Sequence, residues 1–353
     1  MNKENNPISA YKKIYESVIE DIKNGNPEKI SVNNIAGKYG VSRNTADKAI
    51  NMLEQNGWVR RVKRKGTFPV KKNSAQVYSI NILYDHSSFQ SNFLNSYPFV
   101  HAKLIESIFK STLMPQCNLQ MLFIDSADCL ERKKEKLLSL GSRSGLIILD
   151  GFPGFEDIIS IIRSERIPYI TFMPPGSGIN TVFHKDGEGS FNAVNYIIKN
   201  SGKRKIMFLS GNRNESLMKP RYIAYLNALK ANGIPFRDEL VFDLHGNENI
   251  KELTAVLKSG EVDGIFAASF IVGEKVYELM KILDIKIPDA IALAVFHDIP
   301  AFSSSTPSVT AVRTPLELIG TTMLKNLMEM IDFGFRENIK ILLDNELLIR
   351  KST

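Results

Sequence analysis

From Tyr78 onward, short apolar runs alternate with segments of helical apolar spacing, and this alternation constrains the fold more than any other feature. The runs are YSINILY, LQMLFID, GLIILD, IPYITF, KIMFLS, GIFAAS and AIALAVF, at residues 78–84, 119–125, 145–150, 167–172, 205–210, 264–269 and 290–296. Such runs between helices are typical of strands buried on both faces of a parallel sheet. The pattern predicts an α/β fold. About nine such units exceed one sheet of ordinary size, so we expect two lobes.

The first seventy residues have a different pattern, in which three helical segments precede two strand-like runs. Amphipathic spacing and capping residues predict helices over residues 11–24, 31–40 and 42–55. Two strands are predicted over 58–62 and 67–70, joined by a basic turn. This order is that of a small winged helix-turn-helix, whose third helix enters the major groove of DNA.

The positive charge of the chain is concentrated in this segment. Residues 1–72 carry 15 Lys and Arg against 7 Asp and Glu, whereas the rest of the chain carries 30 against 31. Such asymmetry indicates a contact with nucleic acid or an anionic membrane at one end, or else a solvated basic face. The sequence shows neither a secretory leader nor an apolar run of membrane-spanning length, so we expect a cytoplasmic protein.

The third predicted helix separates apolar from polar side chains. Its expected inward face consists of Ala46, Ala49, Ile50 and Leu53. Its opposite face is polar and consists of Arg43, Asn44, Asp47, Lys48 and Asn51. Because Arg can read guanine with two hydrogen bonds and Asn can read adenine, this polar face is predicted to read bases. The basic hairpin tip is predicted to hold phosphates or to enter the minor groove.

These segments resemble the DNA-binding domain of the GntR family. The stretches YKKIYESVIEDIKNG, GVSRNTADKAINMLEQNGW and RKGTF match its three signature blocks in order and spacing. The resemblance implies DNA contacts from the start of the third helix and from the wing. The complete set of expected DNA-binding residues is Asn33, Ser42, Arg43, Asn44, Thr45, Asp47, Lys48, Arg60, Lys63, Arg64, Lys65, Gly66 and Thr67.

Two residues depart from the pattern of that family. Asp47 stands where the family usually has a basic residue, and Asn33 stands where it usually has an arginine in the second helix. A carboxylate repels phosphate. Asp47 is therefore predicted either to accept a hydrogen bond from a cytosine amino group or to hold Arg43 one turn away.

Most of the chain after residue 77 resembles the effector domain of the LacI/GalR type, itself similar to periplasmic sugar-binding proteins. The stretches VFHKDGEGSFNAVNYIIKNSGKRKIMFLSG and RYIAYLNALKANGI carry much of this resemblance. A GntR-type head on such a sensor is the combination of the AraR-type arabinose regulators. The implied domains are a winged helix-turn-helix at 1–70, a linker at 71–77 and an effector domain at 78–353. Lobe 1 is expected to comprise 78–183 and 297–313, and lobe 2 to comprise 184–296 and 314–353, with crossovers near His184, Phe296 and Thr314.

The ligand of such a sheet binds beyond the carboxyl ends of its strands, which places the site in the cleft between two lobes. The expected effector-binding residues are Asp85, His86, Tyr97, Phe99, Met173, Arg221, Phe270, His297 and Asp298. Arg221 is the leading candidate, because the resemblance implies an arginine there that commonly binds a sugar. The family often has an acidic residue where this chain has Met173, and it usually has an Asn-Asp pair where this chain has Ser269 and Phe270. A phosphorylated or acidic sugar, held by Arg221, His297 and Lys185, is therefore a hypothesis.

The residues and the resemblances together predict a ligand-responsive transcriptional regulator, a repressor rather than an activator. We expect it to bind near-palindromic operator DNA as a homodimer and to bind a sugar or sugar derivative as its effector. The alternative is a DNA-binding head fused to a sugar-metabolising enzyme. No nucleotide-binding or hydrolase motif occurs, DGFPGF at 150–155 is interpreted as a turn, and the two cysteines lack metal-ligand spacing. We therefore expect no catalysis, cofactor, metal or membrane contact.

Overall fold

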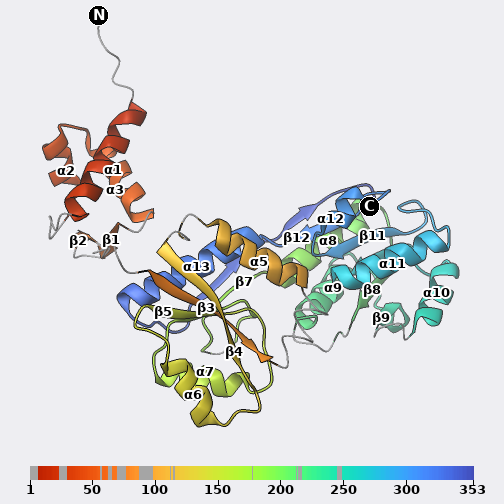
Figure 1. Cartoon of the computed structure of the whole chain (residues 1–353). Coiled ribbons are helices and arrows are strands. Elements are labelled where there is room, and N and C mark those ends of the chain that lie inside the picture. The colour runs from red at the N-terminus through yellow and green to blue at the C-terminus, as the bar shows by residue number, and fades with distance from the viewer. Residues whose placement is uncertain are drawn as a thin grey trace, which may run out of the picture. The chain divides into compact units, whose positions relative to one another are not determined.

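The structure is a computed structural model that describes residues 7–23, 30–55, 58–62, 66–69, 77–86, 98–111, 113, 116–176, 178–211, 213, 217–244 and 249–353. The chain divides into two compact units, Met1–Gln76 and Val77–Thr353, each of which is described by itself (Figure 1). Within the described residues, no helix has the length and apolar character needed to cross a membrane.

The first unit is a three-helix domain with a two-stranded wing. Its helices are α1 (Pro7–Lys23), α2 (Val32–Tyr39) and α3 (Arg43–Gln55), and its antiparallel strands are β1 (Val59–Val62) and β2 (Gly66–Pro69). The expected caps of α2 are confirmed. Ser31 accepts a hydrogen bond from the Asn34 amide at 3.1 Å, and Gly40 ends the helix at a φ of 61°. The expected inward face of α3 is also confirmed, since its four apolar residues are fully buried.

The second unit contains two six-stranded sheets, one in each lobe (Figure 1). The sheet of lobe 1 has the order β13-β7-β6-β5-β3-β4, and its paired strands are all parallel. Its strands are β3 (Tyr78–Asp85), β4 (Cys117–Ile124), β5 (Ser144–Ile148), β6 (Tyr169–Thr171), β7 (Thr181–His184) and β13 (Lys340–Leu343).

The sheet of lobe 2 has the order β14-β12-β11-β10-β8-β9, in which only the pairing of β14 with β12 is antiparallel. Its strands are β8 (Ile206–Ser210), β9 (Val241–Asp243), β10 (Gly264–Ala267), β11 (Ala292–Phe296), β12 (Thr310–Arg313) and β14 (Glu346–Leu348). All seven strands expected from the apolar runs are present, as the alternating pattern predicts.

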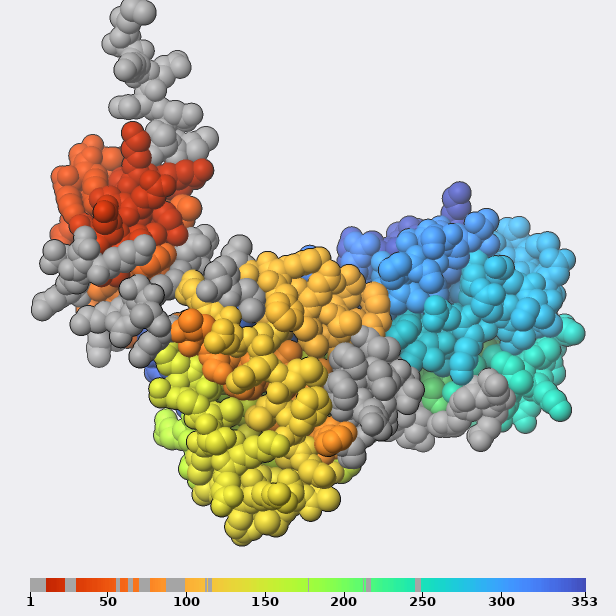
Figure 2. Space-filling view, viewed as in Figure 1, coloured from red at the N-terminus to blue at the C-terminus, as the bar shows by residue number. Residues whose placement is uncertain are grey.

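Helices cover both faces of each sheet, so each lobe has two apolar cores. The helices of lobe 1 are α5 (Pro98–Lys110), α6 (Leu130–Leu138), α7 (Phe155–Ser164) and α13 (Leu316–Phe333). Those of lobe 2 are α8 (Asp186–Asn200), α9 (Lys219–Ala231), α10 (Ile250–Lys258), α11 (Phe270–Ile282) and α12 (Pro300–Ser304). In Figure 2 the first lobe is mostly yellow and the second runs from cyan to blue.

The chain crosses between the lobes three times, at His184–Asp186, Thr314–Pro315 and Asp344–Asn345. The expected division of the lobes is therefore wrong after residue 296. Segment 297–313 belongs to lobe 2, because β12 pairs with β11, and α13 returns to lobe 1, where it packs on α5 and β5. Phe296 ends a strand of lobe 2 and is not a crossover. The third crossover was not expected. It is fixed by β13 and β14, which lie in the apolar stretch IKILLDNELLI but have only four and three residues.

Close packing of α13 on α5 depends on Gly320. A Cβ at this position would overlap Ser107 Oγ and lie 3.1 Å from the carbonyl oxygen of Leu104. We expect Gly320→Ala to lower the free energy of unfolding by about 1–3 kcal/mol, because overpacking outweighs the roughly 1 kcal/mol that alanine gains in a helix. Urea unfolding measures this, with Gly211→Ala as the control, since a Cβ there meets nothing within 4 Å. Equal stability of the two variants would contradict the packing.

Candidate functional site

Most of the residues expected to contact DNA lie at the surface of the first unit. Asn33 on α2 and four residues around the start of α3, namely Ser42, Arg43, Asn44 and Lys48, are exposed, and so is Arg60 on β1. Thr45, Asp47 and Gly66 are half-buried. The expected contacts from Lys63, Arg64 and Lys65 lie outside the described residues. Thr67 was expected to contact DNA, but it is only 8% exposed, so little of its side chain is available. Its carbonyl accepts from the Ile30 amide at 2.8 Å.

Two polar pairs order the surface around α3. Arg43 donates from Nε and Nη2 to Asn33 Oδ1, at 2.9 and 2.6 Å. Asp47 accepts from Arg61 Nη2 on β1 at 2.6 Å and from Asn51 at 3.1 Å. The prediction that Asp47 holds Arg43 is therefore wrong. Arg43 is held from the neighbouring helix, while the Asp47 carboxylate faces the wing strand.

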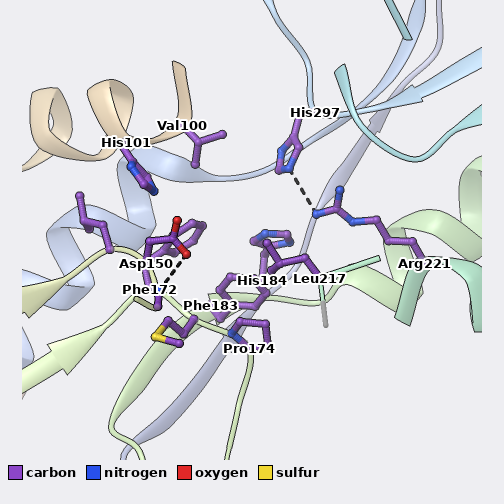
Figure 3. Close-up of a pocket in the computed structure, with 13 residues that line it drawn as sticks. Val100, His101, Asp150, Phe172, Pro174, Phe183, His184, Leu217, Arg221 and His297 are labelled. Carbon is purple, nitrogen blue, oxygen red and sulfur yellow. Dashed lines mark hydrogen bonds between the residues drawn. The ribbon is translucent and has the colours of Figure 1, made fainter. Parts of the chain in front are cut away.

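The second unit has a cavity of about 270 Å³ between its lobes, beyond the carboxyl ends of the strands (Figure 3). Lobe 1 contributes Val100, His101, Leu149, Asp150, Gly151, Phe172, Met173, Pro174, Phe183 and His184. Lobe 2 contributes Leu217, Arg221 and His297. In Figure 3, His101 and Asp150 lie on one side of the cavity and Arg221 and His297 on the other. The lining combines aromatic faces with a few polar groups, which is the composition of a small-molecule site.

Arg221, at the start of α9, is 1% exposed and uses each nitrogen of its guanidinium group. Its Nε donates to Asp186 at 2.7 Å, its Nη1 donates to the carbonyl of Ala268 at 2.6 Å, and its Nη2 lies 3.3 Å from His297 Nε2. The guanidinium carbon also lies 3.8 Å from the centre of the Phe296 ring. Arg221 therefore reaches the cavity with its charge already paired to a buried carboxylate.

His297 follows β11 in a left-handed conformation, at a φ of 72°, which is uncommon for a residue with a side chain. Because an arginine can only donate, Nε2 of His297 must accept from Arg221, and its Nδ1 then donates to Thr314 Oγ1 at 3.2 Å. Burial and the neighbouring Arg221 hold the pKa of His297 well below its usual range. The ring is therefore neutral at pH 7. Non-glycine residues in this conformation cluster at functional sites.

The other two cavity histidines are also neutral at pH 7. Burial lowers the pKa of His184 to about 4, against an opposing effect of Asp186. Burial likewise lowers the pKa of His101 to about 4. The neutral rings can each donate and accept a hydrogen bond, as a hydroxyl group does, so they suit hydroxylated ligands.

Asp150 supplies the carboxylate of lobe 1 in the cavity. It follows β5, and its Oδ1 accepts from the amide of Gly151 at 2.8 Å. Burial raises the pKa of Asp150 to about 6, so it is mostly ionised at pH 7. A carboxylate with raised pKa in a cleft is typical of a functional group, because burial without a full set of partners is costly.

Only three of the expected effector-binding residues line the cavity, namely Met173, Arg221 and His297. Tyr97 lies outside the described residues. Asp85 accepts from the Ser126 amide at 2.7 Å, and Asp298 forms ion pairs with Arg350 and Arg313, so both serve the surrounding structure. His86 is exposed beside Phe123. Phe99 and Phe270 contact each other across the lobes, with ring centres 6.3 Å apart.

Sequence reasoning missed several lining residues, of which Asp150 and His184 matter most. Asp150 is the last residue of the predicted run 145–150. Because ligands bind beyond the carboxyl ends of parallel strands, it could have been chosen as a ligand-binding residue, whereas it was assigned to a turn. His184 ends β7, a four-residue strand with no extended apolar run. His184 was expected only as the place of the first crossover, which the structure confirms, and its part in the cavity lining was not predicted.

The polar residues of the cavity are connected to all three crossovers. Asp186, which binds Arg221, belongs to the first crossover, and Thr314, which binds His297, belongs to the second. Asn345 Nδ2 of the third crossover lies 3.5 Å from His184 Nδ1, and it also donates to the carbonyl of Lys185 at 3.0 Å. A ligand that displaces Arg221 or His297 would therefore act directly on the segments that join the lobes.

No metal centre is formed by the described residues, in which no three His, Cys, Asp or Glu side chains lie close enough to share an ion. Lys185, part of the acidic-ligand hypothesis, does not line the cavity, and its Nζ pairs with Asp344 at 2.5 Å and Glu188 at 3.4 Å.

Two parts of the chain match known protein families. Residues 10–68 match the family described as bacterial regulatory proteins, gntR family, and residues 197–353 match the periplasmic binding protein-like domain. These matches confirm both resemblances found in the sequence.

Known relatives include several regulators. The arabinose metabolism transcriptional repressor of Geobacillus stearothermophilus is 22% identical over 339 residues, which cover 90% of this chain and 89% of the relative. The HTH-type transcriptional regulator CelR of Thermobifida fusca is 25% identical over 155 residues, 43% of this chain and 46% of that protein. The probable HTH-type transcriptional repressor ExuR of Bacillus subtilis (strain 168) is 24% identical, over 59% of this chain and 64% of the relative. The last two matches thus span less than two thirds of the relative.

Solved structures that share the fold include two regulators. The CelR–cellobiose complex superposes with a TM-score of 0.63 at 17% identity, over 92% of this chain and all of the other. The lac repressor dimer bound to operator and the anti-inducer ONPF superposes with a TM-score of 0.62 at 16% identity, over 79% of this chain and 95% of the other. At this identity the likeness establishes the architecture of the chain.

Proposed function

We propose that this chain, a gntR-type helix-turn-helix domain joined to a periplasmic-binding-protein-like domain, is a ligand-responsive transcriptional repressor of carbohydrate-utilisation genes. One observation carries the proposal. The chain combines a basic head, whose α3 exposes Arg43, Asn44 and Lys48, with a separate unit that has a cavity between two lobes, lined by apolar side chains and a few polar ones. The named relatives, which include the arabinose metabolism repressor, support this reading.

The cavity suits an uncharged sugar better than a phosphorylated or acidic one. Arg221 is already paired with Asp186, and the three histidines are neutral at pH 7 because burial lowers their pKa values. Asp150 would repel an anionic ligand, whereas its carboxylate can accept hydrogen bonds from hydroxyl groups. The rings of Phe172 and Phe183 offer apolar surface for the C–H faces of a sugar. The solved CelR structure holds cellobiose, which is an uncharged sugar.

Ligand binding would act on DNA through the lobes. A sugar that contacts Arg221 and His297 binds to groups that are hydrogen-bonded to two of the crossovers. Its differential affinity for two arrangements of the lobes would shift the population between them. In a homodimer this shift changes the spacing of the two heads, and therefore their fit to successive major grooves of a near-palindromic operator.

A thermal-shift screen of the whole chain tests the ligand class. The panel consists of neutral pentoses, hexoses and disaccharides, each matched with its phosphate or uronate. A ligand bound only by the folded state raises the melting temperature, and we expect the neutral members alone to do so. A phosphate or uronate that stabilises the protein more than its neutral partner would contradict the proposed ligand class.

Arg43→Ala tests the DNA-reading role of α3. We expect a loss of about 1–3 kcal/mol in the binding free energy to a duplex enriched from a random pool, with relaxed specificity at one base pair. Fluorescence anisotropy measures both. Arg132→Ala, a change at an exposed arginine of the second unit, is the control and should bind DNA as wild type does. Unchanged affinity in Arg43→Ala would show that α3 is not the reading helix.

The enzymatic alternative predicts a different observation. A sugar-metabolising enzyme would turn over its ligand, so purified protein incubated with ATP and the sugars that stabilise it should consume ATP. The named relatives are transcriptional regulators, and a regulator should leave both ATP and sugar unchanged.

A further inference from the structure

We propose that Asn33 is a positioning residue that aims the Arg43 guanidinium at the edge of one base pair, and that Arg61 is withheld from DNA by Asp47 and Glu54. The inference rests on the proposed function, since it concerns how the head reads its operator. It assigns different tasks to two arginines that composition alone cannot distinguish.

The geometry of the first pair leaves one edge of the arginine available. Asn33 Oδ1 accepts from Nε at 2.9 Å and from Nη2 at 2.6 Å, so Asn33 occupies the inner edge of the planar group. A guanidinium carries five N–H donors in a fixed fork. The outer edge, formed by Nη1 and the second N–H of Nη2, still presents two parallel donors. Two parallel donors match the O6 and N7 acceptors of guanine in the major groove.

The identity of the partner decides what happens to the charge of each arginine. Asn33 is a neutral amide, so Arg43 keeps its full positive charge for DNA while its side chain is held in one orientation. Holding an arginine in place before binding reduces the conformational entropy lost on binding. Arg61 has the opposite arrangement, because Asp47 lies 2.6 Å and Glu54 3.6 Å from its guanidinium nitrogens. Its charge is balanced by two carboxylates.

The position of each pair fits these tasks. Asn33 lies on α2 and Arg43 is the first residue of α3, so their hydrogen bonds span the turn between the two helices. The caps by Ser31 and Gly40 fix the ends of α2, and Ser42 accepts from the Thr45 amide at 3.2 Å at the start of α3. Arg61 lies on β1 and connects the middle of α3 to the wing.

The test is a double-mutant cycle on the full chain, with a duplex enriched from a random pool and its single-base-pair variants. We expect Arg43→Ala to weaken binding about 10- to 100-fold and Asn33→Ala about 5-fold, both with loss of discrimination at the same base pair. In the Arg43→Ala background, Asn33→Ala should have no further effect, since it acts through Arg43. Asn34→Ala, an exposed asparagine one position along α2, is the matched control and should keep that discrimination.

A second variant separates orientation from charge. Asn33→Asp keeps the acceptor but pairs Arg43 with a carboxylate, so it should weaken binding to all duplexes and reduce the slope of affinity against salt. Arg61→Ala should leave that slope unchanged. Additive losses in the double mutant, or an Asn33→Ala defect that is equal on every duplex, would overturn the inference while DNA binding stands. A wild-type chain that binds no duplex would overturn the proposed function itself.

Discussion

Arg221→Ala is expected to lower the free energy of unfolding of the second unit by about 3–5 kcal/mol. The substitution would leave the carboxylate of Asp186, which is 5% exposed, without the cation that now donates to it at 2.7 Å. It would also remove the donor to the Ala268 carbonyl and the contact with the Phe296 ring. Urea unfolding followed by circular dichroism measures the change.

A second variant identifies the cause of this loss. Asp186→Ala combined with Arg221→Ala removes the buried carboxylate that Arg221→Ala leaves without a cation. The double variant should therefore be more stable than Arg221→Ala alone. If Arg221→Ala were as stable as wild type, the arginine would be a free ligand-binding group and the buried ion pair would be absent. The double variant should nevertheless lose sugar binding, because one wall of the cavity would be missing.

Asp150→Asn is expected to stabilise the folded protein at neutral pH. Burial raises the pKa of Asp150 to about 6, above the value of about 3.9 for an unfolded chain. The folded state therefore holds this proton more tightly, and the stability that the group contributes at low pH is lost as pH rises through 6. Asparagine never ionises. The variant should gain over wild type by up to about 3 kcal/mol at pH 7.5, and should match it near pH 4.

The same substitution should weaken binding of a neutral sugar, because an amide oxygen is a poorer acceptor for hydroxyl groups than a carboxylate. Wild-type affinity should also fall between pH 7 and pH 5, as Asp150 takes up its proton, whereas the variant should show no such decline. Calorimetric titration across this range, beside melting curves of both proteins, measures the two effects. A variant that binds the sugar normally and gains no stability would contradict the assigned role of Asp150.

The fold was predictable where apolar residues are continuous in the sequence. The seven strands with long apolar runs and the three helices of the head all appear, because burial on both faces of a sheet or on one face of a helix leaves a clear periodic pattern. The lobe boundaries after residue 296 were not predictable. They depend on β12, β13 and β14, whose three or four residues each pair with strands distant in sequence.

The candidate site was predictable only in part, for a related reason. Arg221 could be located because the resemblance implies an arginine at the start of RYIAYLNALKANGI, and His297 because it directly follows the apolar run AIALAVF. Asp85 and Asp298 also lie near the carboxyl ends of strands, where ligands bind in such sheets. In the fold, however, Asp85 accepts from a backbone amide and Asp298 pairs with two arginines. Asp47 shows the limit most clearly, since its partner Arg61 lies fourteen residues away on another element. Pattern alone does not reveal which polar group meets which.

The central claim is that a ligand in the cavity of the second unit controls binding of DNA by the first. The most direct measurement is fluorescence anisotropy of the full chain on its enriched duplex, at several salt concentrations, with and without the neutral sugar that most raises its melting temperature. We predict salt-sensitive binding whose affinity changes several-fold with sugar in wild type but not in Asp150→Asn at a low sugar concentration. Affinity for DNA that is identical with and without a saturating sugar would contradict the claim.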